Sequence, residues 1–121
     1  MLGLSRRVRV FAYRAPTDMR KSFNTLAALV LEMGQDVVAG DAFLFVGKGR
    51  RLAKVLWFDG TGLCLLAKRL ELGKFAAVWE QAELTSSELV LFLEGSEAIG
   101  RIVLSPAVFS MERDGRVNFL R

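Results

Sequence analysis

The amino-acid sequence predicts an α+β fold: an antiparallel sheet of four or five strands with one long and one short helix. Three observations predict it. Apolar residues recur at helical spacing over residues 17–33, short apolar runs bounded by glycine lie between residues 41 and 79, and a helix-capping motif occupies residues 85–88. Each pattern is typical of the element it predicts. A chain of 121 residues is large enough to bury a core of its own.

Residues 8–13 alternate loosely between apolar and other side chains and predict a first strand. Thr17 or Asp18 then caps a helix that we expect to span residues 17–33. The apolar residues of this segment recur every three or four positions, which places them on one helix face. They are Met19, Phe23, Leu26, Val30 and Met33.

The three apolar runs after this helix predict strands at residues 43–46, 55–58 and 63–66. The strongest turn signal is Asp-Gly-Thr-Gly at residues 59–62, because Asp and Gly tolerate the positive φ of a tight hairpin. A four-residue loop there sets the register of the second and third strands. It pairs Phe58 with Leu63, Leu56 with Leu65, Lys54 with Ala67, Ala53 with Lys68, and Leu52 with Arg69.

The later elements are predicted from weaker signals. Residues 75–79 suggest a further short strand. Thr85 and Glu88 form a capping box that starts a helix over residues 86–94. We expect residues 1–95 to be a single domain.

The strand at residues 63–66 is apolar on both faces, so both faces of the sheet must be covered. The second helix, the tail or another subunit can cover the second face, and we expect at least a homodimer. Residues 102–104 resemble a strand. The segment 96–121 is a C-terminal extension that we expect to pack on the domain or on a partner subunit.

The composition excludes several kinds of catalytic site. The chain has no histidine, which removes the commonest general base and most zinc sites. Cys64 is the single cysteine and lies in an apolar run, so we expect a buried small hydrophobe and no intrachain disulfide. We expect no catalytic residue, metal or cofactor. The remaining enzymatic hypothesis, a carboxylate-metal nuclease, would use Asp18, Asp41 or Asp59, but Asp18 is explained as a cap and Asp59 as a turn residue.

The sequence also favours a cytoplasmic protein. Its longest stretch without a charged residue is shorter than the apolar length of a membrane span, and the N-terminus lacks the pattern of a secretory signal. A single unpaired cysteine suits a reducing compartment. We therefore expect no membrane partner.

Basic residues are concentrated where the predicted hairpin opens. The formal net charge is +4, and residues 48–74 carry seven basic groups against two acidic ones. Such a cluster is either a solvated hairpin end or a phosphate-binding surface. Arg20 and Lys21, in the first turn of the predicted helix, are either tolerated surface residues or a second phosphate contact at the helix N-terminus. The candidate nucleic-acid-binding residues are Arg20, Lys21, Lys48, Arg50, Arg51, Lys54, Lys68, Arg69 and Lys74.

Four motifs in this order resemble a known family. They are PTDMRKSF at 16–23, VLWFDG at 55–60, KRLE at 68–71 followed by Gly-Lys-Phe, and LT-x-x-EL with LEG over 84–95. Together they resemble the small accessory protein called TnpB of the bacterial insertion sequence 66 family, which is usually encoded just ahead of the transposase and is not the RNA-guided nuclease of the same name. The resemblance covers roughly residues 8–95. It implies a protein that assists transposition, and it carries over no catalytic residue.

Two hypotheses remain for how such a protein works. The first is a factor that binds DNA at the element ends through the basic residues and acts with the transposase. The second is an adaptor that binds the transposase or a sister accessory protein without touching DNA, through the acidic helix of residues 83–97 or an uncovered sheet face. Trp57 and Trp79 could stack on bases, but aromatic residues in apolar runs are usually core residues.

Overall fold

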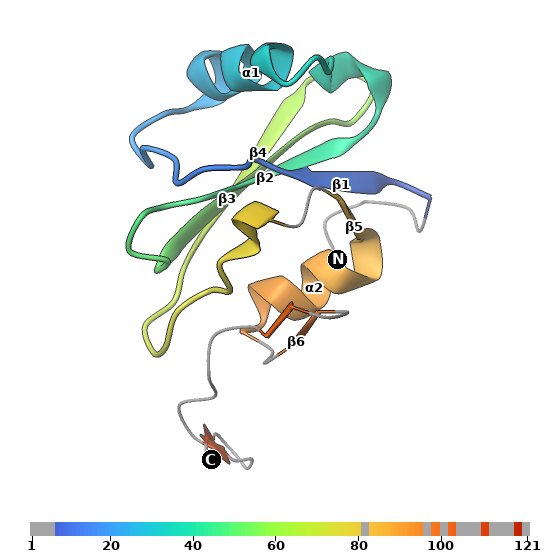
Figure 1. Cartoon of the computed structure of the whole chain (residues 1–121). Helices are drawn as coiled ribbons and strands as arrows, with labels where there is room; N and C mark the ends of the chain where they lie inside the picture. Colours follow the sequence, from blue (N-terminus) through green and yellow to red (C-terminus); the bar gives the residue numbers. More distant parts are fainter. Residues whose placement is uncertain are drawn as a thin grey trace.

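A five-stranded sheet with one helix on each face forms the molecule in this computed structural model (Figure 1). The structure describes residues 7–80 and 83–95, and beyond them the backbone of four two-residue strands. The sheet order is β4-β3-β2-β1-β5, with β1 (Arg9–Ala12), β2 (Ala42–Val46), β3 (Leu52–Phe58), β4 (Leu63–Arg69) and β5 (Glu83–Thr85). The helices are α1 (Phe23–Glu32) and α2 (Ser86–Leu93). The predicted α+β class with a five-stranded sheet is therefore confirmed.

Short elements complete the chain. Two 3-10 turns, η1 (Val37–Ala39) and η2 (Val78–Glu80), follow α1 and precede β5. The remaining strands pair as two separate hairpins: β6 (Ala98–Ile99) with β7 (Ile102–Val103), and β8 (Ser110–Met111) with β9 (Asn118–Phe119).

The sheet is largely antiparallel, as predicted, with one parallel pair. β1 and β2 run parallel, and α1 lies in the connection between them. Parallel neighbours require such a long crossover, usually a helix, whereas a tight turn suffices for antiparallel ones. The predicted register of β3 and β4 is confirmed at every position, from Phe58 opposite Leu63 to Leu52 opposite Arg69.

α1 covers one face of the sheet. Leu26 and Val30 are fully buried against Phe43, Phe45 and Leu56 of β2 and β3. These side chains alternate along each strand with those of the opposite face, because successive strand residues point to opposite sides. The α1 face of the sheet is therefore an aromatic and aliphatic core of its own.

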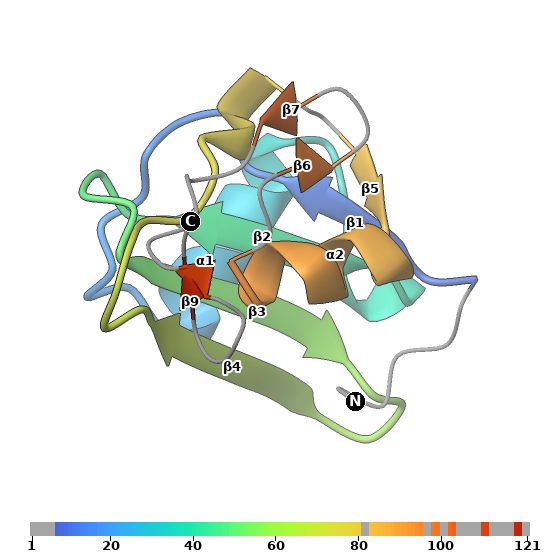
Figure 2. The same ribbon diagram turned by 90° about the horizontal axis from the view of Figure 1, so that it is seen from below.

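α2 and the segment before it cover the other face (Figure 2). Leu89, Phe92 and Leu93 of α2 are buried there, and the Phe92 ring stacks on Phe75 with centroids 4.9 Å apart. Each face of the sheet is thus packed against a helix within one chain, and every residue of β2 is buried, whereas Leu63–Leu66 of β4 stay half-buried. The face opposite α1 is packed against α2, and the second helix was one of the elements predicted to cover this face.

The first helix starts later than predicted. α1 begins at Phe23 and Ser22 is its N-cap, so the predicted start at residue 17 is wrong. The Thr17 amide donates to the Val46 carbonyl at 2.9 Å, which keeps the chain extended beside the end of β2. Asp18 accepts from the Arg20 amide, forming a local turn and not a helix cap. Arg20 and Lys21 consequently lie in a loop before α1.

Other boundaries differ as well. The strand predicted at residues 75–79 is wrong, since the chain there ends in the η2 turn. The strand β5 was not predicted, because three residues are too short to show a period. The second helix and its Thr85 cap are confirmed at Ser86–Leu93. The expected packing of the 96–121 extension on the domain or a partner lies outside the described residues.

Candidate nucleic-acid interface

The predicted phosphate-binding residues lie at one end of the sheet, where segments distant in the sequence meet (Figure 1). These segments are the β2–β3 loop, the paired ends of β3 and β4, residues 70–75 after β4, and the loop 17–22 before α1. We call this region the basic end. It includes the nine predicted basic residues and two carboxylates: Arg20, Lys21, Lys48, Arg50, Arg51, Lys54, Lys68, Arg69 and Lys74, with Asp18 and Glu71.

The β2–β3 loop is a tight, glycine-rich turn. The Gly47 amide donates to the Leu52 carbonyl at 3.0 Å, and the Arg50 amide donates to the Gly47 carbonyl at 2.9 Å. Arg50 has φ of 58°, a left-handed conformation that is uncommon for a residue with a side chain. The turn thereby exposes Lys48 and Arg51 at the tip of the hairpin.

Residues 70–75 are held against this turn by backbone hydrogen bonds. The Leu70 amide donates to the Arg51 carbonyl at 2.8 Å, and the Phe75 amide donates to the Arg50 carbonyl at 2.6 Å. The Arg50 guanidinium donates in return to the Phe75 carbonyl at 3.3 Å. Phe75 itself is buried in the core under α2. Burial of Phe75 in the core therefore fixes the position of the neighbouring Lys74 at the basic end.

The loop 17–22 is anchored from the other side of the sheet. The Lys54 ammonium donates to the Lys21 carbonyl at 2.7 Å, which joins β3 to the loop. Arg20 and Asp18 form an ion pair at 2.7 Å. Hydrogen bonds from the Arg20 side chain and amide hold the pKa of Asp18 well below its usual range, and Asp18 raises the pKa of Arg20. Both groups stay charged, so they cancel one another locally.

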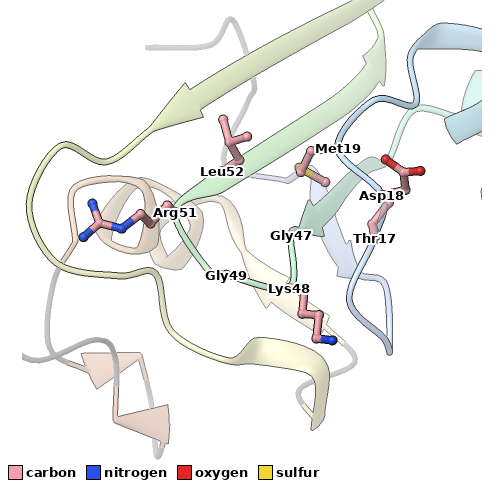
Figure 3. A pocket seen from close by; sticks show the side chains of 8 residues that line it. All are labelled: Thr17, Asp18, Met19, Gly47, Lys48, Gly49, Arg51 and Leu52. Atoms are coloured by element: carbon pink, nitrogen blue, oxygen red, sulfur yellow. The ribbon is translucent and has the colours of Figure 1, made fainter.

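An open pocket of about 320 Å³ separates the two loops (Figure 3). Thr17, Asp18 and Met19 line one side, and the β2–β3 loop lines the other with Gly47, Lys48, Gly49, Arg51 and Leu52. A Cβ on Gly47 would lie 2.7 Å from Cγ of Met19, so a larger residue there would force the Met19 side chain to move. In Figure 3 the Lys48 and Arg51 side chains extend away from the wall that carries Asp18.

The nine cations fall into three groups by their contacts. Arg20 and Arg69 pair with carboxylates, the latter with Glu71 at 2.9 Å. Arg50, Arg51 and Lys54 donate to backbone carbonyls, while Lys21 accepts at its own carbonyl. Within the described part of the chain, four lysines have neither a hydrogen bond nor an ion pair through their ammonium groups: Lys21, Lys48, Lys68 and Lys74.

The hairpin places its cations on both faces of the sheet. Residues directly opposite each other in neighbouring strands share a face. Lys54 and Arg69 lie on the α1 face, whereas Lys68 pairs with Ala53 and lies on the α2 face. The basic residues therefore surround the end of the sheet and do not form a flat stripe on one side.

A model of the protein family described as IS66 Orf2 like protein matches residues 8–100 of this chain. The chain belongs to this family. Two relatives in Sinorhizobium fredii are similar: the uncharacterized protein y4hO is 43% identical over 84 residues, and the uncharacterized protein y4jC is 38% identical over 76 residues. The first alignment covers 69% of this chain and 71% of the relative, and the second covers 62% and 65%. No solved structure matches.

As an IS66 Orf2 like protein, the chain is a transposition-associated accessory protein. The matched region includes the sheet, both helices and all nine predicted site residues. The family resemblance seen in the sequence is thereby confirmed, and it places the basic end inside the part of the chain that the family shares.

The structure of this IS66 Orf2 like protein also bears on the enzymatic hypothesis. Among the described residues, no group of three histidine, cysteine or acidic side chains could hold a metal ion. Asp41 pairs with Arg9 at 3.2 Å, and Asp59 accepts hydrogen bonds inside its own turn. Cys64 is half-buried and not fully buried as expected. Its partial burial, and to a lesser degree Asp59, raises the pKa of the thiol, which keeps it protonated. Across the described segments, no helix has the length and apolar character needed to cross a membrane.

One cation at this end was not predicted. Arg14 follows β1, which ends beside β2 because the two strands run parallel, and its guanidinium donates to the Trp79 carbonyl at 2.7 Å. If β1 and β2 were antiparallel, Arg14 would lie at the opposite end of the sheet. Its place at the basic end therefore follows only from the parallel pairing, which the sequence did not predict.

Trp57 and Trp79 both pack against the core under α2, which confirms the interpretation of these aromatic residues as core.

Proposed function

We propose that this IS66 Orf2 like protein is a DNA-binding accessory factor that acts with the transposase at the ends of its insertion sequence. The observation that carries the proposal is the convergence of nine basic groups from four segments on one end of the sheet, with two carboxylates among them. Like charges held this close repel one another, and phosphate groups relieve that repulsion. Binding would release the counterions condensed on DNA.

Three of the four unpaired lysines supply the principal phosphate contacts in this proposal. Lys48, Lys68 and Lys74 reach solvent from the hairpin tip, from β4 and from the segment before Phe75. Their ammonium groups make no contact within the described residues that DNA would have to break. Such contacts position a protein on DNA and carry no sequence information by themselves.

The pocket beside the β2–β3 loop suits a sugar–phosphate unit. Met19 and Leu52 provide apolar surface, the glycines allow close approach to the backbone, and Lys48 and Arg51 offer charge to a phosphate. This combination of an apolar wall with a few charged groups is typical of small binding sites. We expect one nucleotide of the bound strand to lie there.

The test replaces three of the unpaired lysines together, as Lys48→Gln, Lys68→Gln and Lys74→Gln. Fluorescence anisotropy of a labelled element-end duplex across a salt series should show weaker binding. The slope of log affinity against log salt should also be shallower, by roughly one for each phosphate that the variant no longer neutralises. Circular dichroism should show an unchanged fold, because these ammonium groups form no hydrogen bond or ion pair with the described residues.

A matched control removes the same charge at positions outside the predicted site, Arg101, Arg113 and Arg116, which are not among the described residues. This variant should keep most of the affinity. Equal losses in the two variants would show that total charge matters and that the basic end does not. Unchanged affinity and slope in the lysine variant would sink the proposal.

The adaptor function is the second candidate, and an exposed apolar surface on α1 favours it. Phe23 is 43% exposed and Leu31 is 66% exposed, and the helix has no charged residue before Glu32. Exposed apolar residues on a helix are typical of a protein-binding surface when they cluster. Salt-resistant co-purification with the transposase, abolished by Phe23→Ser and Leu31→Ser, would support this role, whereas a steep decrease of DNA retention with salt would support the first.

A further inference from the structure

β4 is the outermost strand of the five-stranded sheet, and among the described residues no strand pairs with its outer side (Figure 2). The Asp59 amide donates to the Gly62 carbonyl, and the Leu70 amide donates to the Arg51 carbonyl. Antiparallel pairs alternate between hydrogen-bonded and non-hydrogen-bonded ones. With the observed register, the even-numbered residues of β4 bond to β3. The backbone groups of the odd-numbered residues therefore point outward: Leu63, Leu65, Ala67 and Arg69.

Within residues 7–80 and 83–95, this edge lacks the usual protection against pairing with another chain. Exposed edges are normally short, charged, bulged or interrupted by proline. β4 has seven residues, pairs with β3 without a bulge, and has no charge from Leu63 to Ala67. The opposite edge, β5, has only three residues and leads directly into α2. The unprotected edge is therefore specific to β4.

We propose that β4 pairs with β4 of a second copy of this chain, antiparallel and centred on Leu66. A twofold axis there sets Leu66 opposite the partner's Leu66, and pairs Leu65 with the partner's Ala67 and Leu63 with the partner's Arg69. Every outward-pointing residue of one copy then faces an outward-pointing residue of the other. Two-stranded self-pairing of this kind is isologous, as most dimer interfaces are.

The charges on β4 fit this pairing and oppose the alternatives. Lys68 and Arg69 lie at one end of the strand, and Asp59 lies in the turn at the other end. Antiparallel pairing brings the basic end of one strand toward the acidic turn of its partner. A parallel arrangement would instead place like charges side by side, which is destabilising.

The pairing joins the two five-stranded sheets into one continuous sheet. It also sets the two basic ends at opposite ends of the paired β4 strands. If the proposed DNA contact holds, the dimer presents two phosphate-binding surfaces to one duplex. The pairing itself does not depend on DNA and is tested without it.

The first test is Ala67→Pro, studied by light scattering in the tens-of-micromolar range. The Ala67 amide points away from β3, so proline should leave the hairpin intact while removing a donor needed between the copies. The parent should be a dimer and the variant a monomer. Ala67→Val, which keeps the amide, should remain a dimer. A monomeric parent, or a dimeric Ala67→Pro variant with a native circular dichroism spectrum, would overturn the proposal.

The second test is disulfide cross-linking, which decides the question even if Ala67→Pro does not fold. Cys64 lies opposite the partner's Lys68 in this register and about 13 Å along the strand from the partner's Cys64, beyond the reach of a disulfide. Leu66→Cys in a Cys64→Ser background places two cysteines in a non-hydrogen-bonded pair with Cα atoms about 4.5 Å apart. This variant should oxidise to a covalent dimer and the parent should not. Absence of the cross-link at position 66 would refute the pairing.

Discussion

At the scale of single residues, the basic side chains of this protein have different roles. Lys54 and Lys68 lie near each other in paired strands, yet the Lys54 ammonium binds the Lys21 carbonyl at 2.7 Å while Lys68 has no such hydrogen bond in the described chain. The first anchors the loop before α1, and the second remains available to a ligand. Charge alone would not distinguish them.

This difference predicts unequal effects on stability. Lys54→Met should lower the free energy of unfolding by about 1 to 2 kcal/mol, because it removes a half-buried, charge-assisted hydrogen bond and leaves the Lys21 carbonyl without its donor. Lys68→Met should change it by less than about 0.5 kcal/mol, as for most surface substitutions. Urea unfolding followed by tryptophan fluorescence would measure both. Equal effects would contradict the assigned roles.

Asp59 provides a second prediction at this scale. Hydrogen bonds from the Thr61 and Gly62 amides, and then from the Thr61 hydroxyl, lower the pKa of Asp59 to about 2. A carboxyl group whose pKa is lower in the folded state stabilises the protein above its unfolded pKa of about 3.9, and this stabilisation is lost as the pH falls through the folded value. Asp59→Ala should therefore melt at a lower temperature than the parent at pH 7.

The gap between the two melting temperatures should narrow as the pH falls from about 4 toward 2, because the parent carboxylate becomes protonated in that window. Differential scanning calorimetry over this range would follow it. A gap that stays constant with pH would mean that the ionised carboxylate does not support the turn.

At the scale of secondary structure elements, local capping decides where the helices begin. Thr85 accepts from the Glu88 amide at 3.1 Å, and Glu88 accepts from the Thr85 amide at 2.9 Å, so two free donors of α2 are satisfied. α1 begins with a similar contact, in which the Thr25 hydroxyl accepts from the Ser22 amide at 2.9 Å. Each helix thus starts where a side chain satisfies the free backbone groups.

Thr85→Ala should destabilise the protein by about 1 kcal/mol through removal of this cap. Ser87→Ala is the matched control, since Ser87 is exposed in the same helical turn and its side chain makes no hydrogen bond to any described residue. The control should be neutral or slightly stabilising, because alanine favours helix. Thermal unfolding of the two variants would compare them, and an equally large destabilisation by Ser87→Ala would argue against a specific role of the cap.

At the scale of the whole molecule, the sheet connects the two proposals. In these proposals the basic end of the sheet binds DNA and its β4 edge binds a second copy of the chain. The two surfaces share β4, which carries Lys68 and Arg69 at one end and Leu63 at the other. Dimerisation would therefore determine how many phosphate-binding surfaces one assembly presents.

The monomeric Ala67→Pro variant should then bind element-end DNA more weakly than the parent dimer. Its salt dependence should be about half as steep, because one basic end contacts phosphates where two did before. Anisotropy titrations at matched salt concentrations would test this, with Ala67→Val as the control. An unchanged slope would show that a single basic end engages DNA in the dimer.

Local signals in the sequence were enough to predict most elements and the hairpin register. The Asp-Gly-Thr-Gly turn fixes the loop length, and the loop length sets all seven pairs from Phe58–Leu63 to Leu52–Arg69. The capping box likewise specified α2, and the family motifs identified the chain. Each of these signals lies within a few neighbouring residues. The nine cations could also be named from the sequence, and most of them from one hairpin.

Contacts between distant segments settled the rest, and these appear only in the folded molecule. Thr17 and Asp18 have the sequence of a helix cap, but the hydrogen bond from Thr17 to Val46 extends the chain along β2 and delays α1 to Phe23. The parallel pairing of β1 and β2 has no local signal, and it alone carries Arg14 to the basic end. Long-range contacts also decide which cations anchor the fold and which are unpaired. The Lys54 ammonium, for example, donates to the carbonyl of Lys21, which lies 33 positions away in the sequence. Long-range contacts of this kind override local propensity because their energy appears only when the sheet has assembled.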